Sequence, residues 1–397
     1  MESELKSRQE VALAERGTRA IRVASSEAAD TGEAVRQVIA QLEPDSLAGI
    51  MVFCSSRHDL DVVARTFSTT CPGVTTIGCT TAGEITPWGA RSGSITAIGF
   101  PSADFAFHAL CFDGLDDFDP ELAHAAIILL LADAAAKEAA LGPSVDRACL
   151  MLIDGLSRRE ELLAHVCQHV LAGIPMIGGS AGDDLAFVST GVLHGGAFRS
   201  DRATLALLSS RRPLKTLHCD HHVADTAAFA VVTQADPARR RVHELNGLPA
   251  AEEYARLIGV TVAEIDDRLL ARNPFLVRVG GRYFARAVMK VEDSSLVFHS
   301  AIDRGLVLRL GHEGSTPESL GRALANIEAA RPAGGAVIAF QSAQNQLAAR
   351  SLGQGAALDR LYRESGFVGF LGYGEQFREV HLNRSVSGLV IGGEARC

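Results

Sequence analysis

The sequence lacks the segments that would place a chain in or across a membrane. Its longest uninterrupted apolar run, Ala125–Ala132, is far shorter than the roughly 18 residues that cross a bilayer. The charged N-terminus, which begins Met-Glu-Ser-Glu-Leu-Lys, has no apolar core of a signal peptide. We therefore expect a cytoplasmic protein with no membrane association.

The cysteine spacing and the charge balance argue against further classes of protein. The eight cysteines include no Cys-x-x-Cys pair, which argues against a zinc ribbon, a thioredoxin-type site and covalently attached c-type haem. The formal net charge of −9 argues against general nucleic-acid binding, and we interpret the basic runs Arg211–Arg212 and Arg239–Arg241 as solvated turns. No P-loop or Rossmann fingerprint stands at a predicted strand-to-helix turn.

What is present indicates a globular α/β protein with two domains, each a mixed β-sheet flanked by helices. The 397 residues are 47% apolar and 21% charged, which is enough for two cores. Strand and helix patterns alternate in the first half, whereas the second half is rich in hairpin signals such as Gly280-Gly281. We place the junction at the polar, proline-ended stretch Ser210–Pro213, giving domains at 20–212 and 213–397.

Three glycine-rich strand ends, each closing on a carboxylate, predict one shared ligand cleft. Glycine lets backbone amides approach another group closely, and short hydroxyls supply donors. A tight turn is the alternative interpretation of each stretch. The predicted ligand-binding residues are Cys79, Thr80, Thr81, Gly83 and Glu84 in the first stretch, Gly179, Ser180 and Asp183 in the second, and Tyr373 and Glu375 in the third.

The segment Thr216–Val223 holds the densest set of metal-binding residue types in the chain. In a regular strand His218, Asp220 and His222 would share one face, and Cys219 and His221 the other. A polar edge strand is the competing interpretation. His165 and His169 have the i, i+4 spacing of a zinc pair, but they flank the apolar face of a predicted helix, so we favour them less.

The motifs resemble those of FIST-domain proteins. The resemblance rests on Gly78–Glu84, Asp154–Ser157, Gly178–Asp183, Glu244–Ala251 and Tyr373–Gln376, and it extends from about residue 20 to 393. This family implies a bacterial or archaeal signal-sensing module that binds small ligands. The subgroup that the chain resembles most is the haem-binding, nitric-oxide-sensing NosP type. That resemblance implies a histidine kinase or a cyclic-di-GMP enzyme as partner, and a homodimer is one option for the assembly.

We therefore predict a non-enzymatic sensor that binds haem and a gas or small-molecule ligand. A sensing haem iron needs a neutral imidazole on a rigid, apolar wall. We rank His222 first as this metal ligand, because it ends a predicted strand beside the junction; His221, His381 and His299 are the other candidates. A haem-free sensor of a small molecule such as an amino acid is the alternative. A hydrolase or transferase using a Cys79 nucleophile, or Glu84 with Asp183, is less favoured.

Overall fold

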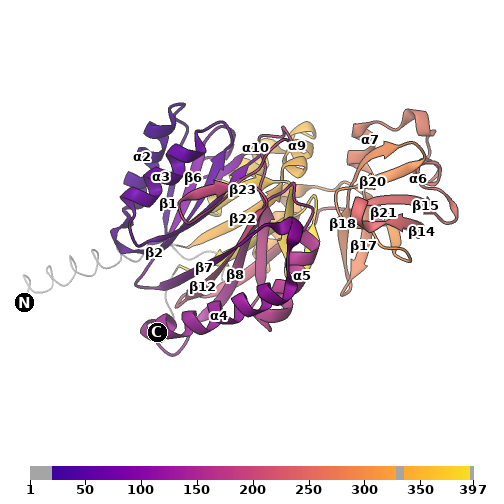
Figure 1. The fold of residues 1–397 in the computed structure, drawn as a ribbon. Helices are drawn as coiled ribbons and strands as arrows, with labels where there is room; N and C mark the ends of the chain where they lie inside the picture. The colour runs from indigo at the N-terminus through magenta and orange to yellow at the C-terminus, as the bar shows by residue number, and fades with distance from the viewer. Residues whose placement is uncertain (1–19, 328–334, 394–397) are drawn as a thin grey trace, which may run out of the picture.

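Three six-stranded mixed sheets build the body of the protein, which a computed structural model describes over residues 20–327 and 335–393 (Figure 1). The first sheet has the order β1 (Arg22–Ser26), β6 (Ile95–Pro101), β2 (Leu47–Ser55), β3 (Thr75–Thr81), β10 (Val192–His194), β11 (Ala197–Arg199). The second has the order β25 (Val380–Leu382), β24 (Gly374–Phe377), β9 (Met176–Ser180), β8 (Asp146–Ile153), β12 (Arg202–Ser210), β7 (Phe105–Asp113). The third has the order β13 (Leu214–Cys219), β26 (Val386–Ile391), β22 (Ala336–Ser342), β23 (Phe367–Gly372), β4 (Glu84–Thr86), β5 (Gly89–Arg91).

The three sheets repeat one topology. Each contains a single parallel pair, β2–β3, β8–β9 or β22–β23, flanked on both sides by antiparallel neighbours. The helices that connect the strands are α2 (Thr31–Leu42), α3 (Leu60–Thr70), α4 (Pro120–Glu138), α5 (Glu160–Leu171), α8 (Thr316–Ala325), α9 (Ala343–Ser351) and α10 (Gly355–Glu364). Local capping fixes several helix starts: Asp30 accepts a hydrogen bond from the Glu33 amide, and Asp59 from the Val62 amide.

The repeats exchange hairpins in a closed cycle. The hairpin β4–β5 follows β3 in sequence but pairs with β23 of the third sheet. The hairpin β10–β11 follows β9 and pairs with β3, and β24–β25 follows β23 and pairs with β9. Each sheet is therefore completed by a strand that belongs, in sequence, to another repeat.

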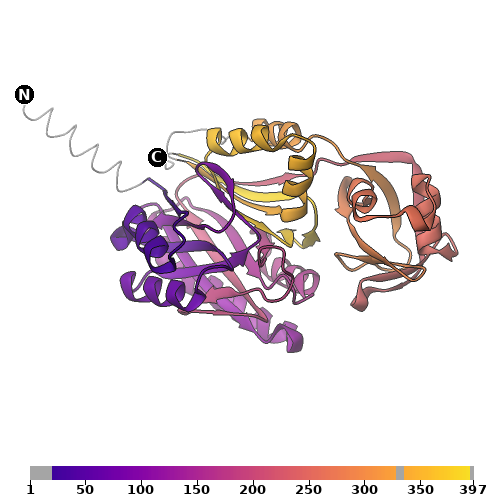
Figure 2. The ribbon, with the colours of Figure 1, turned by 90° about the horizontal axis from the view of Figure 1, so that it is seen from above.

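Apolar packing agrees with this arrangement. Phe53, Leu152 and Phe340, one from each sheet, belong to the same buried cluster at the centre of the body. Separate clusters join the outer face of each sheet to its own helices, such as Phe67 of α3 for the first sheet and Leu320 of α8 for the third. Figure 2 shows these helices around the outside of the body. The sheets therefore pack inward against one another and outward against helices.

A smaller lobe, residues 223–312, is inserted into the third repeat between β13 and α8. Its antiparallel sheet has the order β18 (Arg282–Arg286), β17 (Phe275–Val279), β21 (Val307–His312), β14 (Val223–Asp236), β15 (Arg241–Leu245), β20 (Ser295–Phe298), β19 (Val288–Glu292), with β16 (Leu248–Pro249) paired to β15. Helices α6 (Ala250–Ile258) and α7 (Asp267–Arg272) complete it. Figures 1 and 2 show the lobe, in orange, to one side of the body.

The predicted α/β class with mixed sheets is confirmed. The predicted division at 212/213 does not follow the sheets, because strands from both sides of Pro213 share the second and third sheets of the body. The unit with its own sheet is instead the lobe. The pairing between β4 and β23 joins residues that are far apart in the sequence, so no local sequence pattern indicates it. The predicted junction was misplaced for this reason.

No helix in residues 20–327 and 335–393 has both the length and the hydropathy of a membrane span.

Candidate functional site

The three glycine-rich strand ends meet where the hairpins cross, and they hold one another through backbone hydrogen bonds. The Ala82 amide donates to the Leu371 carbonyl at 2.8 Å, and the Gly182 amide to the Thr80 carbonyl at 3.0 Å. The Tyr373 amide closes the ring by donating to the Ser180 carbonyl at 3.1 Å. We call these three hydrogen bonds the backbone ring. The three stretches do lie together, as predicted, and the backbone ring gives them a structural role; a shared ligand cleft stays a prediction.

The carboxylates of these stretches are occupied by protein donors. Glu84 is fully buried and accepts hydrogen bonds from the Thr81 hydroxyl and from Ser94. Burial raises the pKa of Glu84 to about 7, and these hydrogen bonds act in the opposite direction. Asp183 accepts from the Phe187, Val188 and Ser189 amides and from the Tyr373 hydroxyl, so it fixes the loop that follows β9.

The third carboxylate, Glu375, is fully enclosed and accepts hydrogen bonds from the Ser385 amide and hydroxyl. Burial raises its pKa well above the ordinary range, which favours the protonated carboxyl. Residues Cys79, Thr80, Thr81, Gly83, Glu84, Gly179, Ser180, Asp183, Tyr373 and Glu375 thus have structural partners or buried positions, and their role in ligand binding stays a prediction.

The geometry gives no support to a nucleophile here. Cys79 is completely buried, and this burial raises the pKa of its thiol well above the ordinary value, so the thiolate needed for attack is not formed. Gly178–Gly182 has the Gly-x-Ser-x-Gly spacing, but a loop rather than a helix follows β9. Ser180 is also fully buried, and its hydroxyl accepts a hydrogen bond from Gln376.

A large cavity lies between the lobe and the body. Its volume is about 720 Å³, and apolar side chains from both parts line it: Leu270, Val288 and Met289 from the lobe, and Phe187, Leu347 and Leu352 from the body. Four of these apolar side chains are exposed, with Phe187 at 52% and Leu347 at 50%. Phe187 is positioned by stacking on Tyr373, with ring centroids 4.3 Å apart. Exposed apolar surface gathered in one concavity is typical of a ligand site.

His299 is the predicted histidine that lines this cavity. Its Nε2 lies 3.0 Å from the side-chain nitrogen of Gln344 on α9, and its carbonyl accepts a hydrogen bond from Arg240 at 2.7 Å. Burial, with the nearby charges of Arg240 and Arg384, lowers the pKa of His299 to about 4. The imidazole is therefore neutral at physiological pH and can act as a ligand to a metal.

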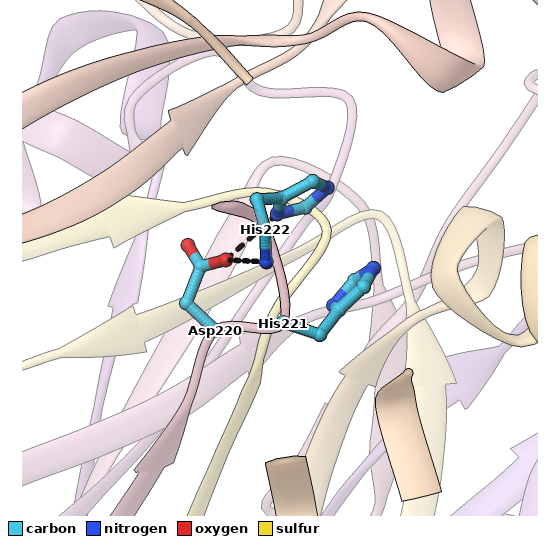
Figure 3. A group of neighbouring side chains, drawn as sticks. All are labelled: Asp220, His221 and His222. Carbon is cyan, nitrogen blue, oxygen red and sulfur yellow. Dashed lines mark hydrogen bonds and ion pairs between the residues drawn. The ribbon is translucent and has the colours of Figure 1, made fainter. Parts of the chain in front are cut away.

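The other predicted histidines, His221, His222 and His381, are not among the described residues that line the cavity. His381 is buried between the side-chain nitrogens of Gln376 and Asn383, at 3.2 and 3.4 Å. The predicted opposite orientation of His221 and His222 is wrong, because β13 ends at Cys219 and residues 220–222 are not in a strand. Their rings instead lie side by side, with centroids 4.1 Å apart (Figure 3).

Ion pairs and a hydrogen bond join the lobe to the body beside the cavity. Arg240 Nη2 lies 2.7 Å from Glu160 Oε2 and 3.0 Å from Glu161 Oε2 at the start of α5, and Glu161 also accepts from the Ala301 amide. The interpretation of Arg239–Arg241 as a solvated turn was therefore wrong for Arg240. It was also wrong for Arg212, which forms a buried ion pair with Asp104 at 2.8 Å. A run of basic residues does not indicate whether its members form ion pairs with acidic residues that are distant in the sequence.

Comparison with protein-family models matches residues 49–248 to the FIST N domain and residues 250–378 to the FIST C domain. The boundary between the two matches falls inside the lobe, at β16. A comparison with curated proteins found no match.

Proposed function

The chain belongs to the FIST-domain family, whose members are signal-sensing proteins, and we propose that its ligand site is the cavity between the lobe and the body. The observation that carries this proposal is the neutral imidazole of His299 on the wall of an apolar cavity of about 720 Å³. A ligand that contacts both the lobe and the body binds more tightly to one relative arrangement of the two parts. Ligand binding therefore shifts the population toward that arrangement, and this shift is the signal.

We propose haem as the cofactor of this cavity. Haem is large, flat and mostly apolar, which suits the exposed faces of Phe187, Met289 and Leu347. Its propionates would find the guanidinium groups of Arg268 and Arg272 at the rim. Haem iron supplies a coordination position at which nitric oxide binds.

His299 is the proposed iron ligand in place of His222. His222 has no exposed side-chain surface and does not line the cavity, so a group as large as haem could reach it only if the surrounding residues moved. His299 needs a smaller change, because only the Gln344 amide must turn away from Nε2. Arg240 donates a hydrogen bond to the His299 carbonyl, so the backbone that carries the imidazole is held in place.

A haem-free small molecule such as an amino acid is the second candidate. The cavity also carries charges of both signs, since Asp267 and Glu313 line it together with Arg268, Arg272 and Arg384. A carboxylate and an ammonium group could each find an opposite charge there. The apolar side chains would then receive the side chain of the ligand.

We propose, on the family resemblance, that the partner is a histidine kinase or a cyclic-di-GMP enzyme that responds to the occupied state. Titration of the purified protein with haem tests the cofactor. We expect one equivalent to produce a Soret band that shifts with nitric oxide. A protein that stays colourless, but whose thermal midpoint rises with one of a panel of amino acids, would favour the haem-free sensor instead.

A further inference from the structure

The two linkers between the body and the lobe cross at a group of metal-binding side chains. The outgoing linker carries Asp220, His221 and His222, and the returning linker carries Glu313. The linkers touch at their backbones, since a Cβ added to Gly314 would lie 2.2 Å from the His221 carbonyl oxygen. These four residues are therefore held together by the crossing itself. We call them the linker cluster.

The donor atoms of the linker cluster already lie close to one another. One ligand atom each from Asp220, His221 and His222 lies within 4.8 Å of the others, and among the described residues this is the group of three with that property. Tetrahedral zinc ligands lie roughly 3.4 Å apart when each is 2.0–2.1 Å from the ion. Side-chain rotations would have to close the remaining difference; Figure 3 shows the three side chains as neighbours.

Unpaired imidazole nitrogens provide the second observation. The His221 and His222 side chains are 1% and 0% exposed, yet His221 Nδ1 and His222 Nε2 have no hydrogen-bond partner in the described structure. Leaving a buried polar atom unpaired costs roughly 1–3 kcal/mol. Because the other nitrogen of each ring faces a carboxylate, the lone pairs of these two atoms are available to an electrophilic partner.

The remaining contacts place a carboxylate beside each of the two imidazoles. Asp220 Oδ1 lies 2.7 Å from His222 Nδ1, and Glu313 Oε1 lies 3.3 Å from His221 Nε2. Carboxylates paired in this way orient the imidazoles that bind a metal. Arg384 donates to Glu313 at 2.6 Å and lies on the same side as the cavity, so it would limit how far Glu313 can turn toward an ion.

We propose that the linker cluster binds one divalent transition-metal ion of the zinc class. His221 and His222 provide two ligands, and Asp220 becomes the third by turning from His222 Nδ1 to the ion. Glu313 acts as the fourth donor or stays as the orienting carboxylate of His221. Two imidazoles with one or two carboxylates suit Zn²⁺ and its neighbours better than Mg²⁺ or Ca²⁺. Bound metal would pin the two linkers together and so fix the position of the lobe on the body.

Cobalt titration of the full chain, first stripped with chelator and free of haem, tests the site. We expect one equivalent of Co²⁺ to bind with visible d–d bands and Zn²⁺ to displace it. His222→Ala and Asp220→Asn should each weaken binding by at least about tenfold. Asp220→Asn preserves shape, so its loss of affinity with unchanged circular dichroism separates binding from folding.

Two controls define the outcomes that overturn the site. His165→Ala/His169→Ala removes the exposed helical pair with zinc-like spacing, and His299→Ala removes the proposed iron ligand; both should retain Co²⁺ binding. Absence of stoichiometric binding by the wild-type protein would overturn the proposal, as would loss of binding in the His165/His169 variant instead. Since haem is absent throughout, neither result bears on the haem proposal.

Discussion

Arg240 Nη2 of the lobe lies 2.7 Å from Glu160 Oε2 of helix α5, and the same guanidinium holds the carbonyl of His299 at 2.7 Å. One side chain therefore connects the body, the lobe and the wall of the cavity. Because the Glu160 side chain is 3% exposed and that of Arg240 13%, this ion pair is screened far less than a surface pair.

Arg240→Met should lower the free energy of unfolding by roughly 3 kcal/mol, because it leaves the Glu160 carboxylate buried without its partner. Urea unfolding measures this loss. The control is Arg322→Ala, which removes an exposed pair with Glu318 and should change stability by about 0.5 kcal/mol or less. Adding Glu160→Gln to Arg240→Met should recover part of the loss. Equal effects of Arg240→Met and Arg322→Ala would contradict the assigned role.

Glu84 should make stability fall as the pH rises. Its folded-state pKa of about 7 lies above the ordinary value of 4.5, so folding favours the protonated carboxyl. The contribution is fully present below about pH 4.5 and is lost toward pH 7, a change on the order of 3 kcal/mol. Glu84→Gln should lack this component, so its stability relative to wild type should rise between pH 5 and pH 8. Parallel pH profiles for the two proteins would rule this out.

The backbone ring should not tolerate a side chain at Gly182. A Cβ there would lie 2.7 Å from the Ala82 amide nitrogen, so Gly182→Ala must displace the ring. We expect a loss of roughly 1–3 kcal/mol, which is typical of overpacking. Gly321→Ala, in helix α8 with open space around it, should instead stabilise by about 0.5–1 kcal/mol. Urea midpoints for the pair decide whether the ring is tightly packed.

Much of the fold follows from local sequence pattern, and the rest does not. The alternation of strands and helices and the hairpin at Gly280-Gly281 are local, and β17–β18 forms around that turn as predicted. The exchange of hairpins is not local. β4 is only three residues long, and its partner β23 lies hundreds of residues away, so neither its hydrophobic pattern nor its turn identifies that partner. The insertion of the lobe was missed for the same reason.

The candidate site shows the same limit. His299 was one of four predicted histidines, and the sequence could not rank it because part of the cavity wall is formed by α9, which follows it by more than forty residues. His221 and His222 were placed on opposite faces by extending a strand beyond Cys219, where the backbone in fact turns into the linker. Residues such as Gln344 and Arg384 gain a role only from the packing of the lobe on the body.

Alkylation tests the nucleophile role once considered for Cys79. Because burial raises the pKa of the Cys79 thiol, iodoacetamide at pH 8 should leave it unmodified in the folded protein and modify it in urea. Cys111, which is only partly buried, should react sooner than Cys79. Mass spectrometry of tryptic peptides reports both sites. Rapid modification of native Cys79 would restore the enzyme hypothesis.

Haem titration of wild type, His299→Gly, His222→Ala and His381→Ala, followed by the Soret spectrum with and without nitric oxide, tests most directly whether the lobe–body cavity is the sensing site. We expect His222→Ala and His381→Ala to retain the wild-type spectrum. His299→Gly should lose it and regain it when free imidazole is added, because the imidazole can enter the vacated position. Wild-type haem binding that survives His299→Gly unchanged but disappears in His222→Ala would contradict the assignment of the cavity.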